Sequence, residues 1–340
     1  MSALLFCISL LPISVVLRST PGYMCGKGIN RVHKITHLFY MDDLKIYASS
    51  KSQLECALNL VLKYTKDIGM SFGLDKCSVV HLQEGKCEDF GTDVELIDGN
   101  VIKHLGTEES YTYLGIPQRG IQNVKNIKET LCNKYKSKLR KIWSSELNGK
   151  NKVSATNMLA IPIILYSFGV VQWTRKELKT LDSKTRKVMN MNRSLHPKAS
   201  VERLYLPRPQ GGRGLLSLEC LQDRSILDAA CRLCKSSDPL LQLAHNHESV
   251  GKGAFVYQAA QRVAKSLQLE LDLSGGEEEQ GASDLISLSV GQRRLAVREA
   301  QLKKLLDAHV GKALHGQYYK NIDRAVYLMG GHSPFFPPLV

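Results

Sequence analysis

Short apolar runs flank a polar turn near the start of the chain. Residues 34–39 and 44–48 are rich in apolar, β-branched and aromatic side chains, which favour extended chain. Asp42 and Asp43 lie between these runs. The pattern therefore predicts a tight β-hairpin with two carboxylates at its tip. Two exposed carboxylates are costly to place side by side unless a cation binds them.

The preceding stretch, residues 3–18, is almost wholly apolar. Apolar residues recur there at three- and four-residue steps: Leu4, Leu5, Ile8, Leu11 and Val15. This spacing predicts a buried helix that packs through this stripe against the hairpin. A secretory signal is the alternative, but no basic residue precedes Arg18 and Pro12 interrupts the run without a clear cleavage site. The run is also short for a membrane span, so we expect an intracellular protein, in nucleus or cytoplasm.

Helical periodicity dominates most of the remaining chain. Residues 52–68 predict a helix with Ser52 as its N-cap, and residues 76–80, 94–101 and 111–116 predict short strands. Further helices are predicted over residues 123–147, 151–166 (interrupted by Pro162), 176–191, 218–234, 255–271 and 286–310. The order predicts an α+β region followed by an all-helical region.

Positive charge is concentrated in about a quarter of the chain. The net charge is +14, and residues 121–198 contain 17 Lys and Arg against 4 Asp and Glu. Clustered positive charge is typical of a surface that binds a polyanion, although a solvated helical face has a similar composition. Residues 123–147 combine an apolar stripe with a cationic remainder, which suits a helix that packs inward and contacts phosphates outward.

The nine cysteines are scattered and odd in number, unlike the dense pattern of a secreted disulfide scaffold, so a reducing interior is expected. Cys231 and Cys234, followed by His245 and His247, suggest a zinc site as an alternative. No second Cys-x-x-Cys pair exists, and this spacing fits no common zinc module.

Several motifs follow one another in an order that resembles a known family. They are Tyr40-Met41-Asp42-Asp43 and residues 67–77, 111–116, 162–167, 195–197, 203–207 and 211–215. A bare Asp-Asp pair is commonly a turn. The ordered set, however, resembles the reverse transcriptase of non-long-terminal-repeat (LINE-type) retrotransposons over about residues 1–245. The resemblance implies an α+β fold: a partial polymerase palm with a short antiparallel sheet, then a helical thumb and a helical C-terminal extension.

The resemblance also implies roles for individual residues. Asp42 and Asp43 would bind Mg²⁺ for two-metal nucleotidyl transfer, and Lys76 would face the incoming triphosphate. The primer 3′ end would be held by Tyr113, Leu114 and Gly115. Nucleic-acid contacts would come from Lys134, Lys138, Lys141, Arg208 and Arg213. The implied partners are an RNA template, an RNA–DNA or DNA duplex and deoxynucleoside triphosphates, with no membrane and no specific protein partner.

Five segments follow from this resemblance: a partial palm (1–118), a basic helical thumb (119–206), a helical extension (207–273), an acidic linker (274–283) and a C-terminal helical segment (284–340). Residues 1–41 contain no Asp or Glu, whereas a two-metal site needs a further carboxylate, which reverse transcriptases take from an upstream palm strand. We therefore expect a truncated polymerase that is inactive as an isolated fragment. The alternative is a non-catalytic nucleic-acid-binding protein or a retrotransposon relic without function.

Overall fold

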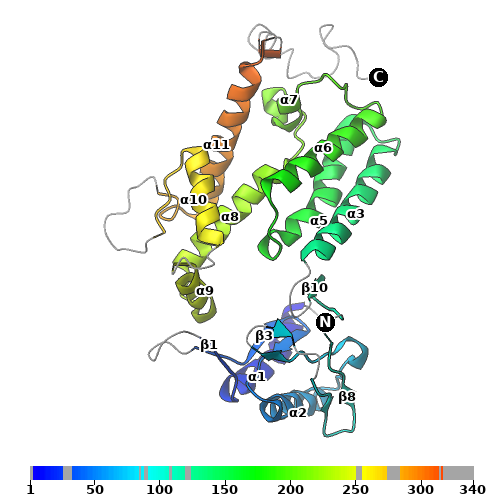
Figure 1. Ribbon diagram of the computed structural model, residues 1–340, viewed down its shortest axis with the longest axis vertical. Coiled ribbons are helices and arrows are strands. Elements are labelled where there is room, and N and C mark those ends of the chain that lie inside the picture. Colours follow the sequence, from blue (N-terminus) through cyan, green and yellow to red (C-terminus); the bar gives the residue numbers. More distant parts are fainter. Residues whose placement is uncertain are drawn as a thin grey trace. The chain divides into compact units, whose positions relative to one another are not determined.

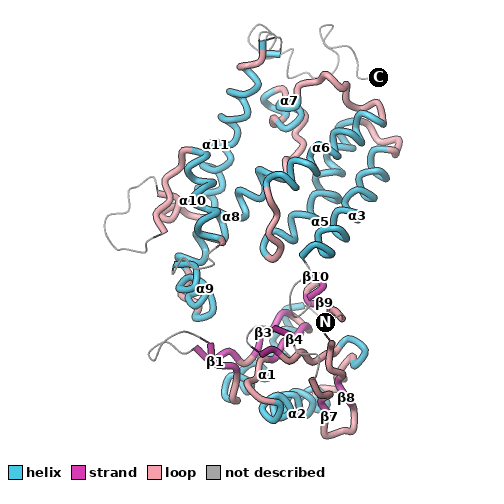
Figure 2. The backbone as a smooth tube through the Cα atoms, in the orientation of Figure 1, coloured by secondary structure: helices cyan, strands magenta, loops and turns pink. Residues whose placement is uncertain are grey.

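A computed structural model describes residues 3–25, 33–83, 86–87, 91–106, 109–118, 124–249, 255–273, 284–313 and 315–316. The chain divides into two compact units, Met1–Asn123 and Val124–Val340. The first combines helices with short antiparallel strands and the second is helical (Figures 1 and 2). The predicted acidic linker, residues 274–283, and the Pro-rich C-terminal end lie outside the described residues.

Two helices and the predicted hairpin form one core of the first unit. The hairpin consists of β3 (His37–Tyr40) and β4 (Asp43–Ile46), and it packs with α1 (Ala3–Ser19) and α2 (Lys51–Asp67). Successive strand residues point to opposite faces. Leu44 and Ile46 of β4, with Phe39 of β3, therefore face this core, whereas Asp43 and Lys45 belong to the other face.

The structure corrects the predicted orientation of α1. Leu10, Ile13 and Leu17 are its buried residues, whereas the predicted stripe is exposed, with Leu4 at 68% and Leu11 at 60%. Because almost every residue of α1 is apolar, periodicity alone could not distinguish the packed face from the open one. The prediction of a helix was right, but the prediction of a fully buried helix with this stripe inward was wrong.

A second core of the first unit lies between α2 and the later strands. It contains Leu62 of α2 together with Val79, Val94, Leu96 and Ile102. The N-cap of α2 is Ser50, whose hydroxyl accepts from the Gln53 N–H, and not Ser52 as predicted. The remaining strands are β1 (Tyr23–Cys25), β2 (His33–Ile35), β5 (Leu82–Gln83), β6 (Lys86–Cys87), β7 (Val94–Glu95), β8 (Val101–Ile102), β9 (Tyr111–Tyr113) and β10 (Ile116–Gln118). Within the described residues, the strands pair as separate two-stranded antiparallel ladders.

In the second unit, α3 (Val124–Trp143), α5 (Ile161–Leu165) and α6 (Arg175–Met191) lie side by side (Figure 1). The predicted helix over residues 151–166 is irregular. It comprises α4 (Gly149–Ala155), the π-helical segment η2 (Thr156–Ala160), α5 and the 3₁₀ turn η3 (Tyr166–Gly169). Pro162 lacks an N–H and disturbs the hydrogen bonds of the preceding turn, which explains this irregularity.

The chain continues through α7 (Val201–Tyr205), η4 (Arg208–Gln210), α8 (Leu218–Lys235), α9 (Pro239–Ser249), α10 (Val256–Leu267) and α11 (Val290–Val310). Helix α8 contacts both α5 and α6, so residues on either side of position 207 share one unit. Asp182 of α6 accepts from the Leu218 N–H at 3.2 Å and from the Ser217 hydroxyl at 2.9 Å, which caps α8. Helix α9 was not predicted. Among the helices that the structure describes, none combines the length and the apolar character needed to cross a membrane.

Candidate functional site

Asp42 and Asp43 lie at the tip of the β3–β4 hairpin. Tyr40 pairs with Asp43, so Met41 and Asp42 form the two-residue turn. Met41 has a φ of 55°, and a positive φ at the first turn position is required by type II′ turns, which usually place Gly there. A non-glycine residue in this region is strained, and such strain is common at functional sites.

Both carboxylates are exposed, and no described residue donates a hydrogen bond to them or forms an ion pair with them. Two oxygen donors on a rigid tip fit Mg²⁺, which usually keeps several waters and takes one or two carboxylates. Among the described residues, no three His, Cys, Asp or Glu side chains form a group that could hold a metal ion. The hairpin therefore offers an open pair of ligands.

Lys45 connects this hairpin to a second one. Its ammonium donates to the Tyr111 hydroxyl at 2.7 Å and lies 5.2 Å from the ring centre of Tyr113, 5.3 Å from that of Tyr111 and 5.7 Å from that of Tyr47. These distances are in the range of cation–π interactions. We call Lys45, Tyr47, Tyr111 and Tyr113 the lysine–tyrosine cluster.

The second hairpin consists of β9 and β10, with Leu114 and Gly115 as its turn. Both turn residues have positive φ, 49° and 73°, as a type I′ turn requires. Burial raises the pKa of Tyr113, and the negative charge of Asp43 adds to this effect while the positive charge of Lys45 opposes it. The structure thus places Tyr113, one of the predicted primer-holding residues, against Lys45, which follows Asp43 by two positions on β4.

Lys76 is exposed at the end of η1 (Leu74–Lys76), a 3₁₀ turn, where a strand was expected. Its backbone N–H donates to the Gly73 carbonyl at 2.8 Å. No hydrogen bond or ion pair between described residues joins Lys76 to either aspartate. A role of Lys76 toward a triphosphate stays a prediction.

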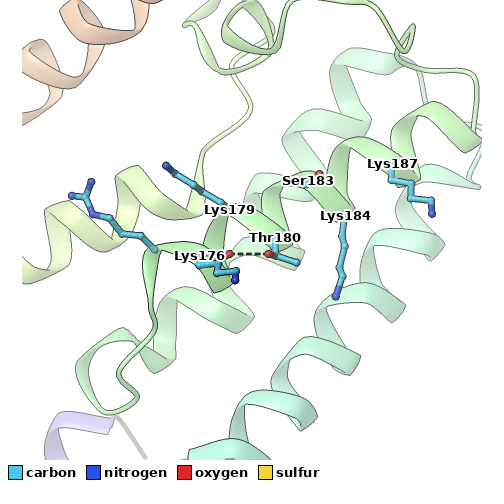
Figure 3. Close-up of a pocket in the computed structure, with 7 residues that line it drawn as sticks. Lys176, Lys179, Thr180, Ser183, Lys184 and Lys187 are labelled. Atoms are coloured by element: carbon cyan, nitrogen blue, oxygen red, sulfur yellow. Dashed lines mark hydrogen bonds between the residues drawn. The ribbon is translucent and has the colours of Figure 1, made fainter.

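Exposed lysines cover α3 and α6 in the second unit. Lys134, Lys138 and Lys141 lie on one exposed side of α3 at four- and three-residue spacing. On α6, a shallow hollow of about 500 Å³ is lined by Arg175, Lys176, Lys179, Thr180, Ser183, Lys184 and Lys187. Figure 3 shows the lysine side chains of α6 projecting from the helix around this hollow. We call the α6 residues the α6 lysine face.

Some basic residues of this region have structural partners instead. Lys128 binds both oxygens of Glu177, at 2.8 and 2.9 Å, and Arg175 pairs with Asp223 at 3.0 Å. No described acidic side chain pairs with Lys176, Lys184 or Lys187. These three ammonium groups, together with the three of α3, are thus available to phosphates.

The two predicted arginines of the Gly-rich segment differ in their surroundings. Arg208 is exposed. Arg213 is half-buried and donates to the Ser194 carbonyl at 2.8 Å, and burial, with the charges of Arg203 and Arg208, lowers the pKa of its guanidinium to about 10. Arg213 therefore has a structural contact, and its contact with nucleic acid stays a prediction.

Sequence reasoning missed the lysine–tyrosine cluster and the α6 lysine face as sites. The signal for the first was present, since Asp43, Lys45 and Tyr47 alternate on one face of an expected strand. The contact of Lys45 with Tyr111, 66 positions further on, is not indicated by any local pattern in the sequence. For α6, lysines at three- and four-residue steps were visible, but the hollow that they line was not.

Comparison with known proteins supports part of this picture. The sequence model of the family described as reverse transcriptase (RNA-dependent DNA polymerase) matches residues 1–118. This stretch contains both hairpins and Lys76. Reverse transcriptases act on nucleic-acid templates and nucleoside triphosphates and use divalent metal ions. No curated protein matches the chain.

Proposed function

We propose that this chain is the palm and thumb portion of a reverse transcriptase of the non-long-terminal-repeat (LINE-type) class. The observation that carries the proposal is the exposed Asp42-Asp43 tip. This tip lies in the stretch that matches the reverse transcriptase family. Lys45 links its hairpin to the hairpin that contains Tyr113. Paired carboxylates beside a segment that holds a primer end are suited to nucleotidyl transfer.

In this proposal Asp42 and Asp43 hold Mg²⁺, which when bound neutralises charge on the reacting phosphates. Tyr113, Leu114 and Gly115 hold the primer end. Lys76 is exposed and contributes positive charge toward the pyrophosphate part of the incoming nucleotide.

The second unit binds the template–primer duplex. The exposed ammonium groups of Lys134, Lys138 and Lys141, together with the α6 lysine face, suit contact with phosphates. Arg208 and Arg213 are additional candidates. Phosphate contacts fix the position of a duplex but do not read its sequence. The expected ligand is therefore an RNA–DNA or DNA duplex of any sequence.

A non-catalytic nucleic-acid-binding protein is the second candidate function. One observation favours it: the basic helices α3 and α6 belong to a unit that contains neither Asp42 nor Asp43. Duplex binding by this unit would not depend on the aspartates.

Fluorescence anisotropy with labelled duplexes tests the proposal. RNA–DNA duplexes of unrelated sequence should bind with equal affinity, and Lys134→Glu/Lys138→Glu/Lys141→Glu should weaken all of them alike. Strong preference for one sequence, or binding unaffected by the triple change, would contradict the assignment of the second unit. Contact between the primer end and the Asp42 hairpin would favour the polymerase function. If the duplex binds without this contact, the non-catalytic alternative is favoured.

A further inference from the structure

The lysine–tyrosine cluster joins two hairpins that are far apart in the sequence. Lys45 follows Asp43 by two positions on β4, so both side chains belong to the strand face opposite the core residues Leu44 and Ile46. Tyr111 and Tyr113 are likewise two positions apart on β9 and meet Lys45 together. The contact thus links the face that carries Asp43 to the strand that leads into the Leu114-Gly115 turn.

The β9–β10 hairpin needs such an anchor. Its strands have three residues each and form a ladder of two strands among the described residues. Isolated two-stranded hairpins are marginally stable in water. Ile116 is buried, while Thr112 and Pro117 are exposed. The half-buried rings of Tyr111 and Tyr113 around Lys45 supply the polar contact.

The hydrogen bond and the aromatic rings around the Lys45 ammonium stabilise the position of this side chain. A charged donor makes a stronger hydrogen bond than a neutral one, and an ammonium surrounded by ring faces gains cation–π attraction as it loses water. The three rings restrict the ammonium from several directions, so the flexible lysine side chain has few other positions.

We propose that Lys45 is a positioning residue that holds the β9–β10 hairpin against the Asp42-Asp43 hairpin, so that both turns act on the same nucleic-acid 3′ end. The role at the 3′ end depends on the proposed function, whereas the locking of the two hairpins does not.

Hydrogen–deuterium exchange tests the locking in the full chain. Lys45→Met keeps the length of the side chain and removes the charge, Lys45→Arg keeps charge and donors, and Tyr111→Phe removes only the hydroxyl. Lys63→Met, at an exposed lysine of α2, is the matched control. We expect amides of residues 111–118 to exchange roughly tenfold faster in Lys45→Met, as the loss of a hydrogen bond to a charged group implies, with a smaller effect for Tyr111→Phe. Lys45→Arg and Lys63→Met should resemble the wild type.

Photocrosslinking tests the consequence for nucleic acid. The probe is an RNA–DNA duplex with a photoreactive thiothymidine at the DNA 3′ end. In the wild type, crosslinks should map to residues 37–47 and 111–118. In Lys45→Met those to 111–118 should be lost, while total duplex binding is unchanged because the second unit provides it. Lys45→Arg should restore them.

Four outcomes distinguish the contact between the two hairpins from its role at the nucleic-acid 3′ end. Unchanged exchange at residues 111–118 in Lys45→Met would overturn the lock, and so would equal acceleration across the whole first unit. Crosslinks to 111–118 that persist in Lys45→Met would overturn the positioning role. If the wild type binds duplex but crosslinks to neither hairpin, the positioning role and the proposed polymerase site both fail, and the exchange data alone decide whether the lock exists.

Discussion

The α6 lysine face should bind phosphates, and neutralising it should change how binding responds to salt. Lys176, Lys184 and Lys187 are exposed, line one hollow and have no described acidic partner. The triple variant Lys176→Gln/Lys184→Gln/Lys187→Gln removes their charge and retains polar side chains of similar length. If each ammonium neutralises one phosphate, the slope of log affinity against log salt falls by about 0.9 per residue on B-form duplex, or about 2.7 in total.

The affinity change follows from the same relation. At about 0.15 M salt, the loss of three released counterions corresponds to roughly a hundredfold weaker binding. Anisotropy titrations of one labelled duplex at several salt concentrations measure both quantities. Because the contacts are to the backbone, duplexes of unrelated sequence should lose the same factor.

A matched variant separates local contact from overall charge. Lys63→Gln/Lys265→Gln/Lys303→Gln removes three exposed lysines outside α3 and α6, so its net charge changes by the same amount. We expect its slope to remain close to that of the wild type. Equal slopes for both triple variants would show that binding depends on the net charge of the protein and not on contacts of the α6 lysine face.

Three further predictions concern stability and activity. Leu10 is 4% exposed, so Leu10→Ala should lower the free energy of unfolding by about 2–5 kcal/mol in urea titrations. Leu11 is 60% exposed, so Leu11→Ala should change this free energy by less than about 0.5 kcal/mol. Equal effects would contradict the observed packing face of α1. Burial raises the pKa of Asp182 to about 6, whereas an aspartate in an unfolded chain titrates at about 4. Between these two values the folded state binds more protons than the unfolded state, so the free energy of unfolding should fall by roughly 3 kcal/mol as the pH rises from about 4 to 7. In Asp182→Asn this part of the pH dependence should vanish, and its persistence would assign it to other groups. A polypeptide of these 340 residues alone should not extend a primer on an RNA template with Mg²⁺ or Mn²⁺, because residues 1–41 contain no further carboxylate to complete a two-metal site. Primer extension that is lost in Asp42→Asn would show this expectation to be wrong.

Patterns of local sequence predicted the elements that carry the site. Runs of apolar, β-branched and aromatic residues on both sides of Asp42 and Asp43 predicted the hairpin, and the structure has Tyr40 opposite Asp43 as a two-residue turn requires. Helical periodicity also placed the main basic helices, since residues 123–147 and 176–191 correspond to α3 and α6. Both patterns, the strand-forming runs and the helical periodicity, involve residues close together in the sequence, so they can be recognised without knowledge of the fold.

Other features depend on contacts that the local sequence does not encode. The packed side of α1 is decided by what Leu10 and Ile13 meet on α2 and the hairpin. The partner of Lys45 is Tyr111, a residue far along the chain. Likewise, whether an arginine faces solvent or the protein is set by tertiary structure, as the contact of Arg213 with the Ser194 carbonyl illustrates.

Asp42 and Asp43 should form a metal-binding tip, and terbium luminescence can detect a metal ion bound there. Tb³⁺ is a hard cation with the oxygen preference of Mg²⁺, and a nearby tyrosine sensitises its emission; Tyr40 stands opposite Asp43 in the ladder. We expect tyrosine-sensitised emission that decreases when Mg²⁺ competes for the site. The emission should be lost in Asp42→Asn/Asp43→Asn and kept in Asp75→Asn, a control at another exposed aspartate of the same unit. Emission that survives the double change, or that falls equally in Asp75→Asn, would contradict the claim.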